Sequence, residues 1–220
     1  MAFLQPDQSD QPFLRAPASV LWLIGALVLV HLAVTLLTAP DQSLVAFELV
    51  PARYSDGAGW FGLTVPLISH MFLHSGFTHL IMNSVWLLAF GSIVARRYGP
   101  ALFIGLFLAS GIAGAALHVA LNWGSPEPAL GASGAIAGLM AAGFRLYRWF
   151  GDVTGPRLMP ILSKQVLMFS GMWIIPNIGF LLLQSNIAGG AHIGGYLFGL
   201  FAVDLIEKLH LARARRRQQA

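Results

Sequence analysis

The chain contains six apolar runs, each about as long as a lipid bilayer is thick. They lie at approximately residues 20–38, 77–95, 101–121, 131–149, 166–183 and 191–209. An α-helix needs about 20 apolar residues to cross the hydrocarbon core, and there only helices or closed barrels can pair every backbone group. The sequence therefore predicts an all-α membrane protein with six transmembrane helices.

The composition agrees with this prediction and leaves no room for a large soluble domain. Of the 220 residues, 56% are apolar and 10% are charged, whereas about 25% of a soluble domain is charged. We therefore predict one membrane domain at 20–209, a cytoplasmic N-terminal tail at 1–19 without the pattern of a secretory signal, and a basic cytoplasmic tail at 210–220. The chain has no cysteine, which excludes disulfides and a thiolate nucleophile.

The connection between the first two runs is polar at first and then apolar but interrupted. Residues 60–72 include Gly62, Pro66 and His70. This segment is too short and too broken to span a bilayer, so we expect it to form a re-entrant or interfacial element.

Lysine and arginine fall almost entirely on one side of the predicted membrane. When alternate ends of the runs are assigned to opposite sides, twelve of the thirteen basic residues share a side with both termini, and Arg53 is the exception. By the positive-inside rule both termini are cytoplasmic. The basic C-terminal cluster then faces anionic lipid headgroups, so we expect membrane lipid as a partner and no nucleic acid.

Polar residues on three of the predicted helices lie at a common depth near the external face. Ser133 begins the fourth helix, His192 begins the sixth, and His79 and Asn83 lie in the first half of the second. Polar groups inside a membrane are unfavourable unless they are paired or reach water, so their convergence indicates a site. Each of these residues also has a simpler explanation. Runs of small residues allow membrane helices to pack closely, and single histidines or asparagines can form hydrogen bonds between helices.

Glycines on the fourth and sixth helices would let their backbones approach each other closely. These glycines are Gly134 and Gly138 near Ser133, and Gly195 and Gly199 near His192. A close approach would allow the imidazole to accept the serine proton, which would make a serine–histidine dyad. No acidic residue is placed to complete a triad, so we expect an aromatic ring or a backbone carbonyl to orient the imidazole. Backbone N–H groups at the start of the fourth helix, with His79 and Asn83, would stabilise an oxyanion.

Three motifs resemble the signatures of the rhomboid intramembrane serine proteases, of the bacterial type. They are HMFLHSGFTHLIMN at 70–83, GASG at 131–134 and AHIGGYLFG at 191–199. The resemblance covers all six runs and implies a rhomboid-like bundle. It further implies that Ser133 is the nucleophile, that His192 is the general base and acid, and that His79, Asn83 and the Ser133 amide form the oxyanion hole.

The resemblance also implies supporting and gating positions. His70 and His74 would support the external loop and the start of the second helix. The helix at 166–183, with Trp173, and the loop that begins at Gln184 would gate and cap the site. The remaining supporting positions are glycines: Gly131, Gly134, Gly195 and Gly199. Two departures affect the surroundings only: residues 64–66 (TVP) replace a Trp-Arg pair of many relatives, and Ala95 replaces an acidic residue of some.

The expected activity is hydrolysis of peptide bonds near the external end of single-pass transmembrane substrates, through an acyl-enzyme, without a cofactor or metal, in a bacterial inner membrane. One alternative is a catalytically silent rhomboid-like protein that binds membrane clients. Another is a metal site on His70 and His74, whose spacing could ligate zinc. However, Met71 occupies the position of the glutamate in the H-E-x-x-H motif. We assign no role to His31, His118 or His210.

Overall fold

The computed structural model describes residues 16–37, 45–146, 158–183 and 187–218, and within these ranges the chain is helical and has no β-strand. Five of its helices are α1 (Ala18–Leu37), α7 (Pro100–Leu121), α8 (Ser133–Leu146), α9 (Lys164–Leu182) and α10 (Gly189–Gln218). Another long helix consists of α5 (Phe77–Trp86), a π-helical turn η3 (Leu87–Gly91) and α6 (Ser92–Tyr98). The prediction of an all-α membrane bundle is confirmed.

The segment after α1 forms short helical pieces, as an interfacial or re-entrant element requires. These pieces are η1 (Val45–Phe47), α2 (Ala52–Ser55), α3 (Trp60–Thr64), α4 (Pro66–Ser69) and η2 (His70–Phe72). The isolated bridge between Leu49 and Ala129 ties this segment to the loop that precedes α8. This segment therefore lies against the start of α8.

Five helices, rather than the six expected, are long and apolar enough to cross a membrane within the described ranges. The exception is α8, whose 14 residues extend over about 21 Å, less than the roughly 30 Å hydrocarbon core. The final part of the predicted run, 147–149, lies outside the described residues. At the other extreme, α10 does not end near residue 209 but continues to Gln218, because its basic end is rich in helix-forming Ala, Leu and Arg and lacks Gly and Pro.

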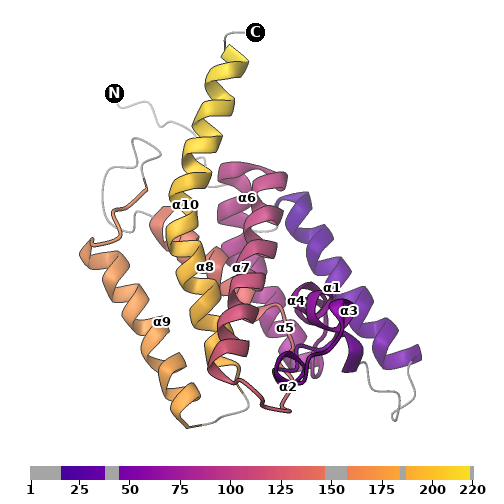
Figure 1. The fold of residues 1–220 in the computed structure, drawn as a ribbon. Helices are drawn as coiled ribbons and strands as arrows, with labels where there is room; N and C mark the ends of the chain where they lie inside the picture. The colour runs from indigo at the N-terminus through magenta and orange to yellow at the C-terminus, as the bar shows by residue number, and fades with distance from the viewer. Residues whose placement is uncertain (1–15, 38–44, 147–157, 184–186, 219–220) are drawn as a thin grey trace, which may run out of the picture.

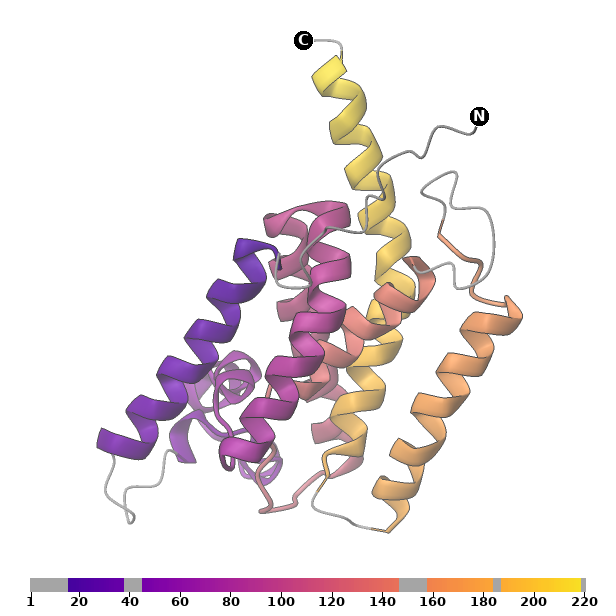
Figure 2. The same ribbon diagram turned by 180° about the vertical axis from the view of Figure 1, so that it is seen from behind.

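Helix α8 lies at the centre of the bundle, with α7 and α10 beside it and α1 and α9 at opposite edges (Figures 1 and 2). Gly99, with a φ of +81°, turns the chain between α6 and α7, and Pro100 begins α7. A positive φ favours glycine, and proline suits a first helical position. Of the spanning helices, α9 has the smallest buried share, 11%. It is the helix least held by its neighbours.

Glycines bring the backbones of α8 and α10 into direct contact. A Cβ atom on Gly195 would overlap the carbonyl of Gly134, and one on Gly199 would overlap the carbonyl of Gly138. A Cβ on Gly138 would also overlap the Ser110 hydroxyl of α7. Only glycine allows this approach, which is how small residues pack membrane helices. The packing aligns the first residues of α8 and α10.

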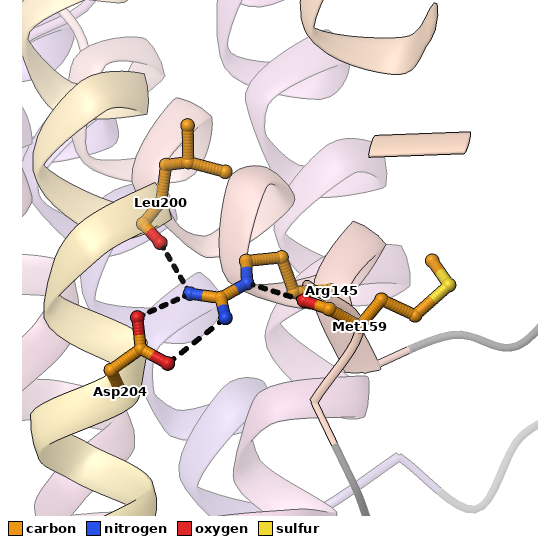
Figure 3. A network of polar contacts seen from close by, with 4 residues as sticks. All are labelled: Arg145, Met159, Leu200 and Asp204. Carbon is orange, nitrogen blue, oxygen red and sulfur yellow. Dashed lines mark hydrogen bonds and ion pairs between the residues drawn. The ribbon is translucent and has the colours of Figure 1, made fainter. Parts of the chain in front are cut away.

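An ion pair with a buried arginine joins the same two helices nearer the C-terminal end of α10 (Figure 3). The Arg145 guanidinium, whose side chain is 4% exposed, donates to both carboxylate oxygens of Asp204 at 2.7 and 2.9 Å. It also donates to the carbonyls of Leu200 at 2.8 Å and Met159 at 2.9 Å. Arg145 follows Ser133 by twelve residues and Asp204 follows His192 by the same number. The two helices are therefore held in register at both levels.

A further ion pair connects α6 to α10 at the same end of the bundle. Arg97 lies 2.5 Å from the Glu207 carboxylate and 3.2 Å from Nε2 of His210. The His210 ring also meets the Tyr98 ring edge to face. His210, to which the sequence assigned no role, thus belongs to a structural contact far from the predicted site.

Candidate active site

Ser133 and His192 meet at the first turns of α8 and α10. The Oγ of Ser133 lies 2.7 Å from Nε2 of His192. This is a normal hydrogen-bond distance for a nucleophile and its base. The contact lies at the end of the bundle opposite the C-terminal end of α10 (Figure 1). The glycine contacts described above bring these residues together from positions 59 residues apart in the chain.

The orienting partner of the imidazole is the side chain of Asn177 on α9. Its Oδ1 lies 2.7 Å from Nδ1 of His192, while its Nδ2 donates to the Trp173 carbonyl at 2.8 Å. Because the amide nitrogen faces a carbonyl, the amide oxygen faces the imidazole. Nδ1 of His192 therefore carries the hydrogen, and Nε2 is free to accept the serine proton.

The side chain that orients His192 by a hydrogen bond is therefore a group that the sequence did not single out. Trp173 does lie beside it, with ring centroids 5.9 Å apart, but the hydrogen bond comes from Asn177. The signal was available in the sequence: Asn177 is a polar residue within an apolar run, four positions after Trp173 and so on the same helix face.

Gly131 brings the predicted oxyanion donors next to Ser133. Its φ is +110°, and its N–H donates to the His70 carbonyl at 2.9 Å. A Cβ there would lie 2.7 Å from Nε2 of His79 and 3.3 Å from Nδ2 of Asn83, so both the backbone conformation and the space require glycine. The His79 and Asn83 side chains thus lie against the backbone two residues before Ser133.

Both of these side chains have a nitrogen available to donate. Nδ1 of His79 lies 3.2 Å from the Ser75 hydroxyl. When that hydroxyl donates, Nε2 of His79 carries the ring hydrogen. Nδ2 of Asn83 is buried and has no acceptor in the described part of the chain. The first backbone N–H groups of α8 have no intrahelical acceptor either. Together they can receive a developing negative charge.

Two cavities that share lining residues lie beside the contact between Ser133 and His192. The smaller, of about 270 Å³, is lined by Ser133, His192, His79 and Ser75 among others. The larger, of about 770 Å³, shares Ser75, Pro128, Leu130, Ile187 and Ala188 with it. The larger cavity also contacts His118 and Asn122, whose side chains lie 3.4 Å apart. A polar hollow next to the dyad is what hydrolysis inside a membrane requires.

The supporting histidines occupy different environments. Nδ1 of His70 lies 2.7 Å from the Pro66 carbonyl and therefore donates to it. His74 is buried between the rings of His79, at 5.2 Å, and His31, at 6.3 Å. Neither ring nitrogen of His74 has a hydrogen-bond partner among the described residues. Gln184, expected to belong to the cap, lies outside the described residues.

No group of three or more His, Asp or Glu side chains in the described ranges is arranged to hold a metal ion. His70 and His74 are therefore not joined by a third possible ligand among the described residues. Nδ1 of His70 is also engaged in a hydrogen bond to the Pro66 carbonyl. The metal-site alternative therefore has no donor set in this part of the chain.

The burial of His74 leads us to expect that the free energy of unfolding depends on pH. Burial, with His79 nearby, lowers the pKa of His74 to about 4, and burial lowers the pKa of His70 to a similar value. In the unfolded chain the histidine pKa is about 6.5. Between pH 6.5 and pH 4 the unfolded chain therefore binds more protons than the folded protein, and the free energy of unfolding decreases as the pH falls through this range.

Replacement of His74 by glutamine should remove the part of this pH-dependent destabilisation that comes from His74. We expect the drop in unfolding free energy between pH 7 and pH 5 to shrink by about 1 kcal/mol, allowing for partial solvent screening. Thermal or denaturant unfolding in detergent at the two pH values measures it. His70 keeps part of the dependence, but an unchanged drop in His74→Gln would contradict the role assigned to His74.

Comparison with known proteins identifies the same family along most of the chain. The Rhomboid domain family matches residues 62–208. The chain is 34% identical to "Rhomboid protease GluP" of Bacillus subtilis over 73% of its length, and 29% identical to "Putative rhomboid protease YdcA" of the same organism over 93%. It is 25% identical to "Rhomboid protease GlpG" of Yersinia pestis over 85%. These matches cover 29%, 90% and 63% of the respective relatives.

Proposed function

Because this chain belongs to the rhomboid family, we propose that it is an intramembrane serine endopeptidase with Ser133 as nucleophile and His192 as base. The observation that carries the proposal is the 2.7 Å contact between Ser133 Oγ and His192 Nε2, with Nδ1 held by Asn177. An unperturbed serine hydroxyl is a weak nucleophile, and a base in hydrogen-bond contact is the group that activates it.

In the proposed reaction, Ser133 Oγ attacks the carbonyl carbon of the scissile peptide while His192 Nε2 takes the hydroxyl proton. The resulting oxyanion accepts hydrogen bonds from the Ser133 N–H, His79 and Asn83. His192 then gives its proton to the leaving amine, which leaves an ester on Ser133. Water from the adjoining cavities hydrolyses this ester with His192 again acting as base.

The substrates proposed are single-pass transmembrane proteins, cut near the external end of the spanning helix. The amides of such a helix are hydrogen-bonded within it, so a segment has to unwind before its carbonyl can reach Ser133. Glycine weakens a helix by about 1 kcal/mol relative to alanine, which favours substrates with glycine near the cut. The protein is an integral membrane protein, and we propose that both termini are cytoplasmic and that it resides in a bacterial inner membrane.

The test is cleavage by the purified protein of a single-span substrate in detergent, with the cut located by mass spectrometry. We expect one cut near the external end, no effect of a strong chelator, labelling by a serine-directed fluorophosphonate, and no product or label with Ser133→Ala. A cut near the cytoplasmic end would overturn the topology, and inhibition by the chelator would overturn the serine mechanism. Substrate binding without a cut or label would favour a client-binding protein.

A further inference from the structure

Helix α9 is the least embedded spanning helix, and yet it supplies the acceptor that orients the His192 imidazole. Its buried residues are Val166 and Asn177. A buried polar side chain on a lipid-facing helix is unfavourable unless its hydrogen bonds are satisfied. Both ends of the Asn177 amide are satisfied, at Trp173 and at His192. The second of these bonds exists only while α9 packs against α10.

The backbone around Asn177 is adapted to this contact. Pro176 interrupts α9 directly before it, and proline in a helix interior removes one backbone hydrogen bond. On the facing helix, a Cβ atom on Gly189 would overlap the Asn177 carbonyl oxygen. The start of α10 and this turn of α9 are therefore in backbone contact, three residues before His192. Any shift of α9 at this point acts directly on the imidazole.

We propose that Asn177 is a positioning residue that makes the competence of the dyad depend on the docking of α9. With α9 docked, the Nδ1–H of His192 is held by Asn177 and Nε2 accepts from Ser133. When α9 moves away, the imidazole loses its acceptor, and it can turn or take the tautomer whose Nε2–H cannot accept a proton. The inference rests on the proposed serine-protease function and adds to it a coupling between helix docking and catalysis.

The role of the acceptor is tested by two variants that both lose the hydrogen bond to Trp173. Asn177→Leu also removes the acceptor, whereas Asn177→Asp keeps a carboxylate oxygen facing Nδ1–H, as in a serine–histidine–aspartate triad. We expect Asn177→Leu to lower kcat and the rate of fluorophosphonate labelling by about 10- to 100-fold, with KM nearly unchanged. Asn177→Asp should recover most of this loss.

The role of docking is tested on the opposite helix. Gly189→Ala adds one methyl group against the Asn177 carbonyl and should displace α9, with a fall in kcat similar to that of Asn177→Leu. The double variant should be no slower than either single variant, because both break one interaction. Gly179→Ala is the matched control, since a Cβ at that position of α9 meets nothing within 4 Å, and its kcat should be unchanged.

Nitrogen-15 NMR of the His192 imidazole gives a readout that does not need activity. A protonated Nδ1 in the wild type, and a mixture of tautomers in Asn177→Leu, would support the proposal. The same tautomer in the wild type and in Asn177→Leu would overturn the proposal. It would also be overturned if kcat fell equally in Asn177→Leu and Asn177→Asp, or if the losses of Asn177→Leu and Gly189→Ala were additive. Wild-type protein without cleavage or labelling would refute the protease function, and the NMR comparison would still decide the coupling.

Discussion

Replacement of Ser133 by alanine is expected to lower peptide-bond cleavage by about 10⁴- to 10⁶-fold, and replacement of His192 by alanine by a comparable factor. In the proposed mechanism the hydroxyl and the imidazole, which are in contact at 2.7 Å, act as one unit, because neither performs the attack alone. The double variant should therefore be no slower than either single variant. Single-turnover cleavage of a transmembrane substrate in detergent measures all three rates.

Matched controls separate this effect from a general loss of structure. Ser84→Ala removes a hydroxyl that bonds the Leu80 carbonyl within α5, and His210→Gln removes an imidazole at the far end of α10. Both should keep cleavage within a few-fold of wild type. Substantial cleavage by Ser133→Ala, or a double variant slower by the product of the two single effects, would mean that another group attacks the substrate.

The second large effect is expected at the ion pair between Arg145 and Asp204. The Arg145 side chain is 4% exposed, whereas that of Asp204 is 46% exposed. Asp204→Asn removes the negative charge that compensates the buried Arg145 guanidinium. It should lower the unfolding free energy by about 3 kcal/mol. Arg145→Met leaves a carboxylate that water can reach, so its effect should be smaller, on the order of 2 kcal/mol from the Met159 carbonyl that loses its donor.

The combination Arg145→Met with Asp204→Leu tests the reason for this asymmetry. The double variant leaves no buried charge without a partner, so it should be more stable than Asp204→Asn. Unfolding in mixed micelles measures the differences, and Lys208→Gln, which removes an exposed charge from the same helix, should change the free energy by less than about 0.5 kcal/mol. Equal effects of the two single variants would contradict the burial argument.

Much of the architecture could be predicted because bilayer thickness and helix rise act on each segment separately. The apolar runs correspond to α1, α5 to α6, α7, α9 and α10, and the broken segment at 60–72 forms short helices. Helix ends were less predictable, because they depend on the neighbouring elements. Within the described residues α8 has 14 residues, most of them buried among the other helices, and α10 continues to Gln218.

Residue type and depth alone indicated which groups could form the site. A serine, two histidines and an asparagine near one membrane face were recognisable, and so were the glycines that allow α8 and α10 to touch. Their catalytic roles stay predictions, while their proximity is a property of the fold. The side chain that contacts Nδ1 of His192, Asn177, was not among the groups that the sequence singled out.

What only the tertiary structure decided is how helices distant in the chain are rotated and docked against one another. Asn177 orients His192 because α9 turns that face inward, and Arg145 meets Asp204 because glycine contacts keep α8 and α10 in register. An apolar helix buries any of its faces in lipid at similar free energy, so local pattern does not select a rotation. That selection comes from interhelical packing and hydrogen bonds, which exist only once the bundle has assembled.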